Sequence, residues 1–302
     1  MNLPFLLPLV LVMGAAVADP AAAETEAAPE AAPEAGSIVK APLTLGNKTY
    51  TAFWHLPAGE PLGFIQVQHG FSRNCNHQRD TIARFMNQGL MAMCLNADMS
   101  GGNPALADKL AAALVAGLTA PDGRPVPEKI VVAGHSAGGH FASRLGWTLA
   151  SLAPQRLVGA VLFDPVAADS SFTTHLRGVS AAGQRPVLAV SANAGACNAQ
   201  NNAYPALRLV QADALAAGGD GFVGLQLTDR STHVDSEGNN TDLLGWTACF
   251  QGKPRPVNTG TLRDLTSTWA RDQVTGLRTP AAYPGGSGVE ALIAAGDAVL
   301  ID

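Results

Sequence analysis

The sequence is poor in features on which several classes of protein depend. Aromatic residues make up 6% of the 302 residues, too few to favour a surface that stacks nucleic-acid bases or sugar rings. Five acidic residues and no Lys or Arg lie in residues 19–37, and they account for the whole formal net charge of −5. Residues 38–302 are therefore electrically balanced, which argues against nucleic acid or an acidic membrane as a partner and fits an uncharged substrate.

The N-terminus lacks a basic residue ahead of its apolar run, an atypical feature for an export signal. Residues 3–12 are almost entirely apolar, and residues 16–18 supply the small side chains of an A-x-A-like cleavage site. The run is shorter than the ~20 residues that a membrane-spanning helix needs, and Pro4 and Pro8 interrupt it. We therefore predict a cleaved signal peptide over residues 1–18, with an uncleaved membrane anchor as the alternative. The mature protein is expected to be secreted or periplasmic, without a stable membrane span.

Residues 19–37 contain no large apolar side chain. They consist almost entirely of Ala, Pro and Glu, a composition that favours a disordered or extended linker. Residues 38–302 are long enough to form one α/β domain with a buried core and a pocket, and we expect a monomer.

Cysteine is scarce, with Cys75, Cys94, Cys197 and Cys249 as its only occurrences. No two are spaced as in C-x-x-C, and no pair of His completes a zinc set, so we expect no metal site and no organic cofactor. An even number of cysteines in an exported protein favours disulfides, for which three pairings exist. A free, buried Cys94 inside a strand is the alternative.

From about residue 38, short apolar runs alternate with helical stretches. The predicted strands are residues 50–56, 63–68, 90–96, 129–134, 157–163, 186–191 and 222–228. The predicted helices are residues 78–88, 104–118, 137–152, 204–217 and 259–272. Continuously apolar strands that alternate with helices predict a mainly parallel sheet covered on both faces. The tail from Ala281 to the C-terminus is not assigned to an element.

Ligands of such sheets bind beyond the carboxyl ends of the strands, so the residues that follow the strands are the informative ones. Residues 134–138 read Gly-His-Ser-Ala-Gly and match G-x-S-x-G, with a strand before them and a helix after them. This context predicts a sharp turn that exposes the Ser136 hydroxyl as a nucleophile. The competing interpretation is a Gly-rich turn whose Ser has no chemical role.

A Ser hydroxyl needs a base to take its proton, and in proteins with such a turn the chain order is Ser, acid, His. His233 follows the last strong strand, whereas His175 comes too soon after Ser136. We therefore predict His233 as the base, against the alternative of a surface-loop His.

The acid is sought at the ends of the strands that follow Ser136. The strand 157–163 ends at Asp164, which we predict to orient His233, although an Asp before Pro also makes turns. Asp169 is the second candidate and Asn193 the third. Asp235 lies too close to His233 along the chain to orient its ring.

The tetrahedral intermediate of acyl transfer needs N–H donors for its negative oxygen. One is the backbone N–H of Ala137, the residue after the nucleophile. The second is expected after the strand 63–68, where Gly70 lets the backbone turn and the N–H of Phe71 follows. His69 is expected to have a structural role.

Taken together, the motifs HGFS (69–72), GHSAGG (134–139), FDPV (163–166) and THVDSEG (232–238) resemble those of the α/β-hydrolase superfamily. The resemblance covers about residues 49–272 and is strongest to its chlorophyllase-like, cutinase-like and polyester-hydrolase-like group. It implies an α/β-hydrolase catalytic domain over residues 38–302 and a serine esterase chemistry. Chlorophyllases use the Asp of a similar Asp-Pro-Val, which supports Asp164, whereas polyester hydrolases usually place the acid one strand later.

The resemblance also bears on the cysteines and on the substrate. A disulfide that braces the His loop in polyester hydrolases implies a Cys197–Cys249 pair, which leaves Cys75 and Cys94 to pair with each other. Residues 165–185 are too few for a large helical cap, so we expect an open or lightly covered cleft. Such a cleft admits small-molecule, bulky, lipid-like or polymeric esters. An amidase or peptidase with the same triad and a catalytically silent binding protein of this fold remain as alternatives.

Overall fold

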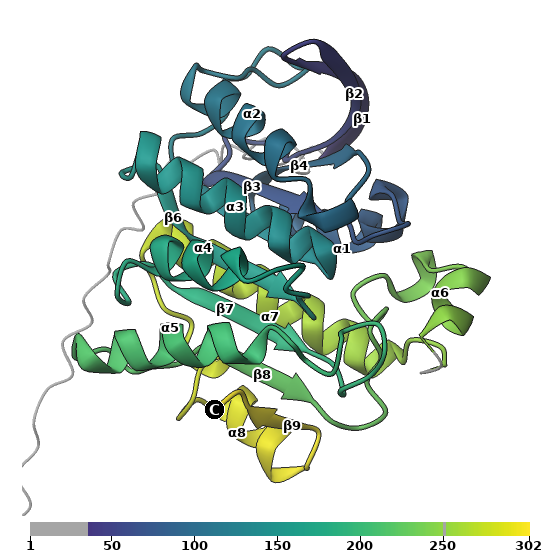
Figure 1. The fold of residues 1–302 in the computed structure, drawn as a ribbon, viewed down its shortest axis with the longest axis vertical. Coiled ribbons are helices and arrows are strands. Elements are labelled where there is room, and N and C mark those ends of the chain that lie inside the picture. The colour runs from purple at the N-terminus through teal and green to yellow at the C-terminus, as the bar shows by residue number, and fades with distance from the viewer. Residues whose placement is uncertain (1–35, 250–251) are drawn as a thin grey trace, which may run out of the picture. The chain divides into compact units, whose positions relative to one another are not determined.

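The computed structural model describes residues 36–249 and 252–302 (Figure 1). The predicted signal peptide (1–18) lies outside the described residues, as does the predicted linker (19–37) except for its last two residues. No helix in the described part of the chain is long and apolar enough to cross a membrane.

The strands are β1 (Ser37–Leu45), β2 (Lys48–Leu56), β3 (Gly63–Gln68), β4 (Leu90–Asn96), β5 (Ile130–His135), β6 (Leu157–Phe163), β7 (Val187–Ser191), β8 (Gly224–Leu227) and β9 (Ala298–Leu300). The α-helices are α1 (Arg79–Asn87), α2 (Pro104–Val115), α3 (Ala137–Leu152), α4 (Ser171–Ser180), α5 (Tyr204–Ala216), α6 (Leu243–Ala248), α7 (Pro256–Thr275) and α8 (Ser287–Ala294). Short 3-10 helices are η1 (Cys75–Gln78), η2 (Ser100–Gly102), η3 (Gly238–Asn240) and η4 (Pro280–Ala282).

All nine described strands form one sheet in the order β1-β2-β4-β3-β5-β6-β7-β8-β9. The six strands from β4 to β8 in this order are parallel, while β1, β2 and β9 run antiparallel to their neighbours. Every residue of the central strands β3 and β5 is buried, as expected for a sheet that is covered on both faces.

Two apolar layers enclose the sheet. Helices α2, α3, α4 and α5 pack in a row on one face, and Figure 1 shows them side by side. Helices α1, α7 and α8 cover the other face, where Trp269 of α7 is fully buried. This architecture confirms the predicted fold class, an α/β protein with a mainly parallel sheet and helices on both faces, and residues 36–249 and 252–302 contain no large cap domain.

Besides α6, which the sequence did not predict, three parts of the chain differ from the sequence-based expectations. Strand β1 begins at Ser37, one residue inside the predicted linker, and pairs with β2 along its length. Helix α4 forms in the segment that was expected only to connect two strands. The unassigned tail folds back as η4, α8 and β9, and β9 extends the sheet beside β8.

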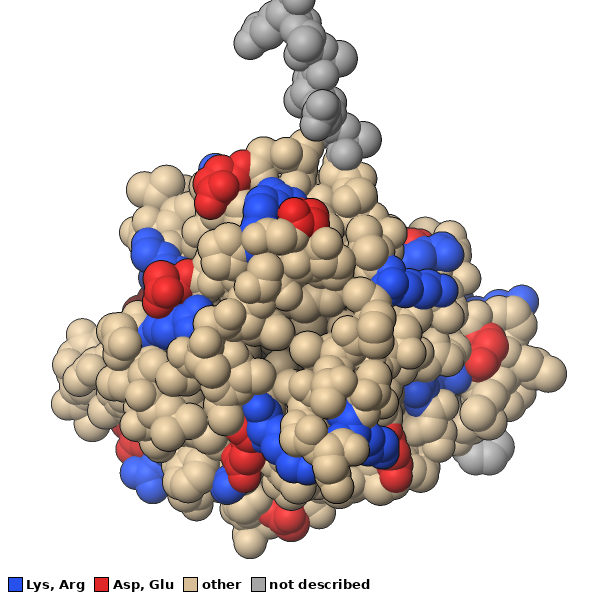
Figure 2. Space-filling model, turned by 90° about the horizontal axis from the view of Figure 1, so that it is seen from above, with Lys and Arg blue, Asp and Glu red and all other residues tan. Residues whose placement is uncertain are grey.

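On the face shown in Figure 2, Lys and Arg side chains lie mostly next to Asp and Glu, and no broad region of one sign stands out. This distribution agrees with the electrical balance of residues 38–302.

Candidate active site

The strand order places a crevice next to the G-x-S-x-G turn. From β3 the chain crosses to β4 on one side, and from β5 it crosses to β6 on the other side. The loops that follow β3 and β5 therefore diverge, which is the arrangement that binds ligands in open α/β sheets. Register pairs Gln68 with Gly134 and His135 with Phe163, so Gly70, Ser136 and Asp164 follow three neighbouring strand ends.

Ser136 occupies the sharp turn between β5 and α3. Its φ of 57° and ψ of −127° lie in a region that few residues other than glycine adopt. A Cβ on Gly134 would collide with the carbonyl oxygen of Gly138, so the flanking glycines permit the close passage of the turn. The backbone is held by hydrogen bonds from the N–H of Ser136 to Phe163 and from the N–H of Val166 to Ser136.

Asp164 and His233 meet although 69 residues separate them. His233 Nδ1 lies 2.6 Å from Asp164 Oδ2, and both side chains are buried. A carboxylate only accepts hydrogen bonds, so this contact places a proton on Nδ1 and leaves Nε2 as the basic nitrogen. Asp164 has a positive φ of 41°, which turns its side chain at the end of β6.

The other residues considered for this role make contacts of their own. Asp169 has a side chain that is 62% exposed, and its carboxylate accepts from the N–H of Ser171. Asn193 donates its amide to the carbonyl oxygen of Thr228. Asp235 accepts from the N–H and the hydroxyl of Thr232, and burial raises the pKa of its carboxyl to about 6.

The two residues expected to supply N–H donors line the same pocket as Ser136. Ala137 is the first residue of α3, so its N–H has no acceptor inside the helix. Phe71 follows Gly70, where a Cβ would stand 2.9 Å from the Cβ of Ser136. His69 lies under this turn with Nδ1 2.9 Å from the carbonyl oxygen of Gly70, and burial lowers its pKa to about 4.

A pocket of about 490 Å³ opens at this edge of the sheet. Its lining includes Phe71, Ser136, Ala137 and His233, and α6 contributes residues of a further wall. The side chain of Phe71 is 60% exposed at its mouth. The pocket agrees with the expected lightly covered cleft, because α6 is a single short helix.

Sequence reasoning missed Asn198, which supports Asp164. The Asn198 amide lies 3.2 and 3.1 Å from the two carboxylate oxygens of Asp164, and the N–H of Ala192 lies 3.0 Å from Oδ1. Asn198 is fully buried. It sits in the loop after β7, but nothing in the local sequence distinguishes it from three other Asn residues nearby.

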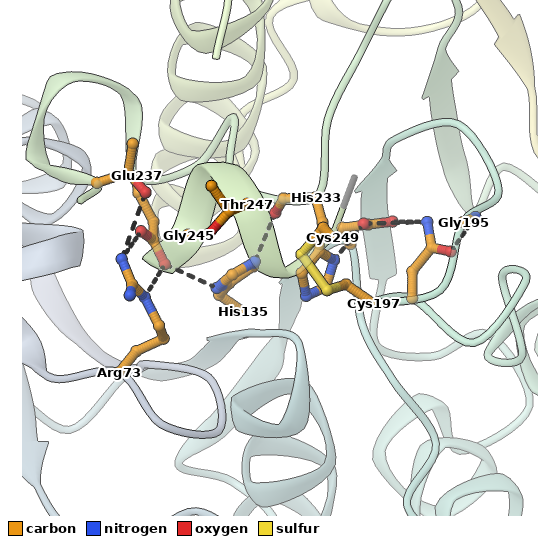
Figure 3. The surroundings of a disulfide bond; sticks show 12 residues. Arg73, His135, Gly195, Cys197, His233, Glu237, Gly245, Thr247 and Cys249 are labelled. Carbon is orange, nitrogen blue, oxygen red and sulfur yellow. Dashed lines mark hydrogen bonds and ion pairs between the residues drawn. A yellow bond between two sulfur atoms is a disulfide. The ribbon is translucent and has the colours of Figure 1, made fainter. Parts of the chain in front are cut away.

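Both disulfides that the resemblance implied are present, namely Cys75–Cys94 and Cys197–Cys249. Figure 3 shows the second bond between the loop that carries Asn198 and the end of α6, close to His233. Cys197 and Cys249 also line the pocket. This bond therefore joins the loop whose Asn198 contacts Asp164 to helix α6, which forms a wall of the pocket.

No protein-family model matches the chain. No curated protein sequence matches it either. Solved structures do match, among them a dienelactone hydrolase-like promiscuous phosphotriesterase from metagenomic libraries (TM-score 0.56, 16% identity, 80% of this chain and 99% of that chain). The esterase domain of a Rhodothermus marinus protein (TM-score 0.53, 14% identity, 79% and 100%) is similar as well. So is a dienelactone hydrolase from Anabaena variabilis (TM-score 0.52, 15% identity, 78% and 97%). At these identities the likeness establishes the fold, which is the α/β-hydrolase fold.

Proposed function

We propose that this protein hydrolyses carboxylic esters through a triad of Ser136, His233 and Asp164. The observation that carries the proposal is the 2.6 Å contact between His233 and Asp164, with Ser136 and His233 lining the same pocket. The names of several structural neighbours, which include esterases and dienelactone hydrolases, lend further support.

In the proposed cycle, His233 Nε2 takes the proton of the Ser136 hydroxyl while the oxygen attacks the ester carbonyl. Asp164 holds the ring and stabilises the imidazolium that forms. The N–H groups of Phe71 and Ala137 donate to the negative oxygen of the tetrahedral intermediate. His233 then gives the proton to the leaving alcohol, and a water activated by the same nitrogen hydrolyses the acyl-enzyme.

The pocket supports an uncharged substrate. Phe71, Leu244 and Ala248 give it apolar walls, and its charged lining residues, Arg73 and Glu237, form an ion pair with each other. A bulky, lipid-like or polymeric ester fits such a lightly covered site. The two disulfides support a secreted or periplasmic location, because such bonds persist in oxidising compartments.

The test is hydrolysis of p-nitrophenyl esters of increasing acyl length by the wild type and by Ser136→Ala. We expect the wild type to hydrolyse these esters and the variant to lose about 10⁴- to 10⁶-fold in kcat, as loss of a triad serine does elsewhere. Equal activity of the two folded proteins, or no hydrolysis of any ester, would exclude the proposal. A matched pair of ester and amide substrates distinguishes an esterase from an amidase.

A further inference from the structure

A buried ion pair joins the loop after β3 to the loop that carries His233. Arg73 and Glu237 contact each other through two parallel hydrogen bonds, Nε to Oε1 at 2.8 Å and Nη2 to Oε2 at 2.5 Å. Their side chains are 8% and 0% exposed. Burial alone would raise the pKa of the Glu237 carboxyl, but the hydrogen bonds from Arg73 and its positive charge hold it below its usual value. The pair is therefore charged at neutral pH and fixed in geometry.

Each partner lies close to a group of the proposed site. Arg73 is two residues beyond Phe71, and its N–H donates to the carbonyl oxygen of Gly70 at 3.3 Å, which closes the turn that presents the Phe71 N–H. Glu237 is four residues beyond His233, in the same loop. A shift of one partner against the other would therefore change the position of an oxyanion donor relative to the base.

His135, the residue before Ser136, contacts the same loop (Figure 3). Its Nε2 lies 2.7 Å from the carbonyl oxygen of His233, and its Nδ1 lies 3.9 Å from Glu237 Oε1. Burial, together with the nearby His233, lowers the pKa of His135 to about 4, so the ring is neutral. Since a carbonyl oxygen only accepts, the single proton is on Nε2, and His135 donates to the backbone of His233.

A second arm of Arg73 reaches the pocket wall. Arg73 Nη1 lies 2.8 Å from Asp242 Oδ1, and the same carboxylate accepts from the N–H of Gly245 at 2.9 Å as the N-cap of α6. Leu244 and Ala248 of α6 line the pocket. Arg73 thus contacts both the loop that carries the base and the helix that forms a wall.

We propose that the Arg73–Glu237 pair is a positioning device for the reaction, which fixes the Phe71 donor relative to His233, and that the Arg73–Asp242 contact separately fixes the substrate wall. This inference rests on the proposed esterase function. The two contacts of Arg73 affect different stages of the reaction. The contact with Glu237 concerns the stabilisation of charge that develops only in the transition state, whereas the contact with Asp242 concerns the binding of substrate. A misplacement of about 1 Å in such a site can cost 100-fold in rate.

The experiment compares Glu237→Gln and Asp242→Asn with the wild type on one p-nitrophenyl ester. Gln keeps the size of Glu and removes its charge, and we expect kcat to fall about 10- to 100-fold with little change in KM. Asn remains a good N-cap, so we expect Asp242→Asn to raise KM while kcat changes little. Arg73→Lys, the second variant, keeps the charge but loses the two parallel bonds to Glu237 and disturbs the contact with Asp242, so it should lower kcat as Glu237→Gln does and also raise KM.

The matched control is Arg144→Gln. Arg144 also makes two parallel bonds to a carboxylate, that of Asp108, but it joins α3 to α2 and does not line the pocket. We expect this variant to lower Tm and to leave kcat and KM unchanged. If the role of Glu237 were purely structural, Glu237→Gln would behave like Arg144→Gln, with a lower Tm and unchanged kcat and KM.

A second readout isolates the oxyanion donors. An arylboronic acid binds a reactive serine as a tetrahedral, negatively charged adduct, and its affinity should fall in Glu237→Gln by the same factor as kcat. This inference would be overturned if Glu237→Gln and Arg73→Lys both had the kinetics and the boronate affinity of the wild type. The proposed function would stand in that case, provided that Ser136→Ala is inactive. A wild type without esterase activity, or an active Ser136→Ala, would instead overturn the proposed function and this inference with it.

Discussion

A carboxylate introduced at Asn198 is the most direct test of the proposal that Asp164 is the acid that orients His233. The Asn198 amide donates to both oxygens of Asp164 at 3.2 and 3.1 Å, so Asn198→Asp replaces a donor with a second negative charge at almost unchanged size. Two carboxylates at this separation cannot both ionise easily, and they share a proton.

The size of the effect follows from the distances. With about 4 Å between the charge centres and an effective dielectric constant of about 20, the repulsion is about 4 kcal/mol, which corresponds to about 3 units of pKa. The pair then keeps roughly one proton up to about pH 7, compared with about 3.9 for an ordinary Asp. His233 loses its fully charged partner at neutral pH, and a triad without that charge loses up to about 10⁴-fold in kcat.

The assay is the pH dependence of kcat/KM on a p-nitrophenyl ester. We expect the acid limb of Asn198→Asp to move upward by two units or more, with activity partly recovered at high pH. Asn198→Ala serves as the comparison, because it removes the amide and leaves the N–H of Ala192 on Asp164. The kcat of Asn198→Ala should fall about tenfold, and the acid limb of its pH profile should stay close to that of the wild type. An Asn198→Asp profile identical to that of the wild type would refute Asp164 as the acid.

Two further predictions concern stability. Replacing both cysteines of Cys197–Cys249, which closes 52 residues, should cost about 4 kcal/mol and also lower kcat, because this bond lines the pocket. Replacing Cys75–Cys94, which closes 19 residues, should cost about 3 kcal/mol and leave kcat unchanged in ester assays that accompany urea unfolding. Burial raises the pKa of Asp235 to about 6, so its proton stabilises the folded state fully below about pH 4, and this contribution is lost as pH rises through about 6. Asp235→Asn has no such titration, so at pH 7 it should avoid this loss of up to roughly 2–3 kcal/mol in the free energy of unfolding. A Tm difference between wild type and variant that does not grow from pH 4 to pH 7 would contradict it.

The fold was predictable where local pattern and burial agree. The apolar runs of β3, β5 and β6 alternate with helices, and this pattern is sufficient to predict a parallel sheet. Strand β1 was missed because it lies at the sheet edge and follows a segment of Ala, Pro and Glu. Strand β9 was missed because three residues carry no periodicity, and only pairing with β8 makes them a strand.

The same distinction applies to the candidate site, where some residues could be predicted from the sequence and others could not. Ser136, Asp164 and His233 each follow a recognisable strand, and parallel strands bring their ends to one edge, so their proximity could be inferred from chain order alone. The side chains that hold them could not. Arg73 and Glu237 are 164 residues apart, in two loops whose course no local pattern determines, and each on its own reads as a solvated surface charge. Their burial is tolerated only because each neutralises the other, so the charge and the loop geometry must be found together. The strand ends of such a site can therefore be predicted from the sequence, whereas the buried ion pair beside it becomes evident only in the folded structure.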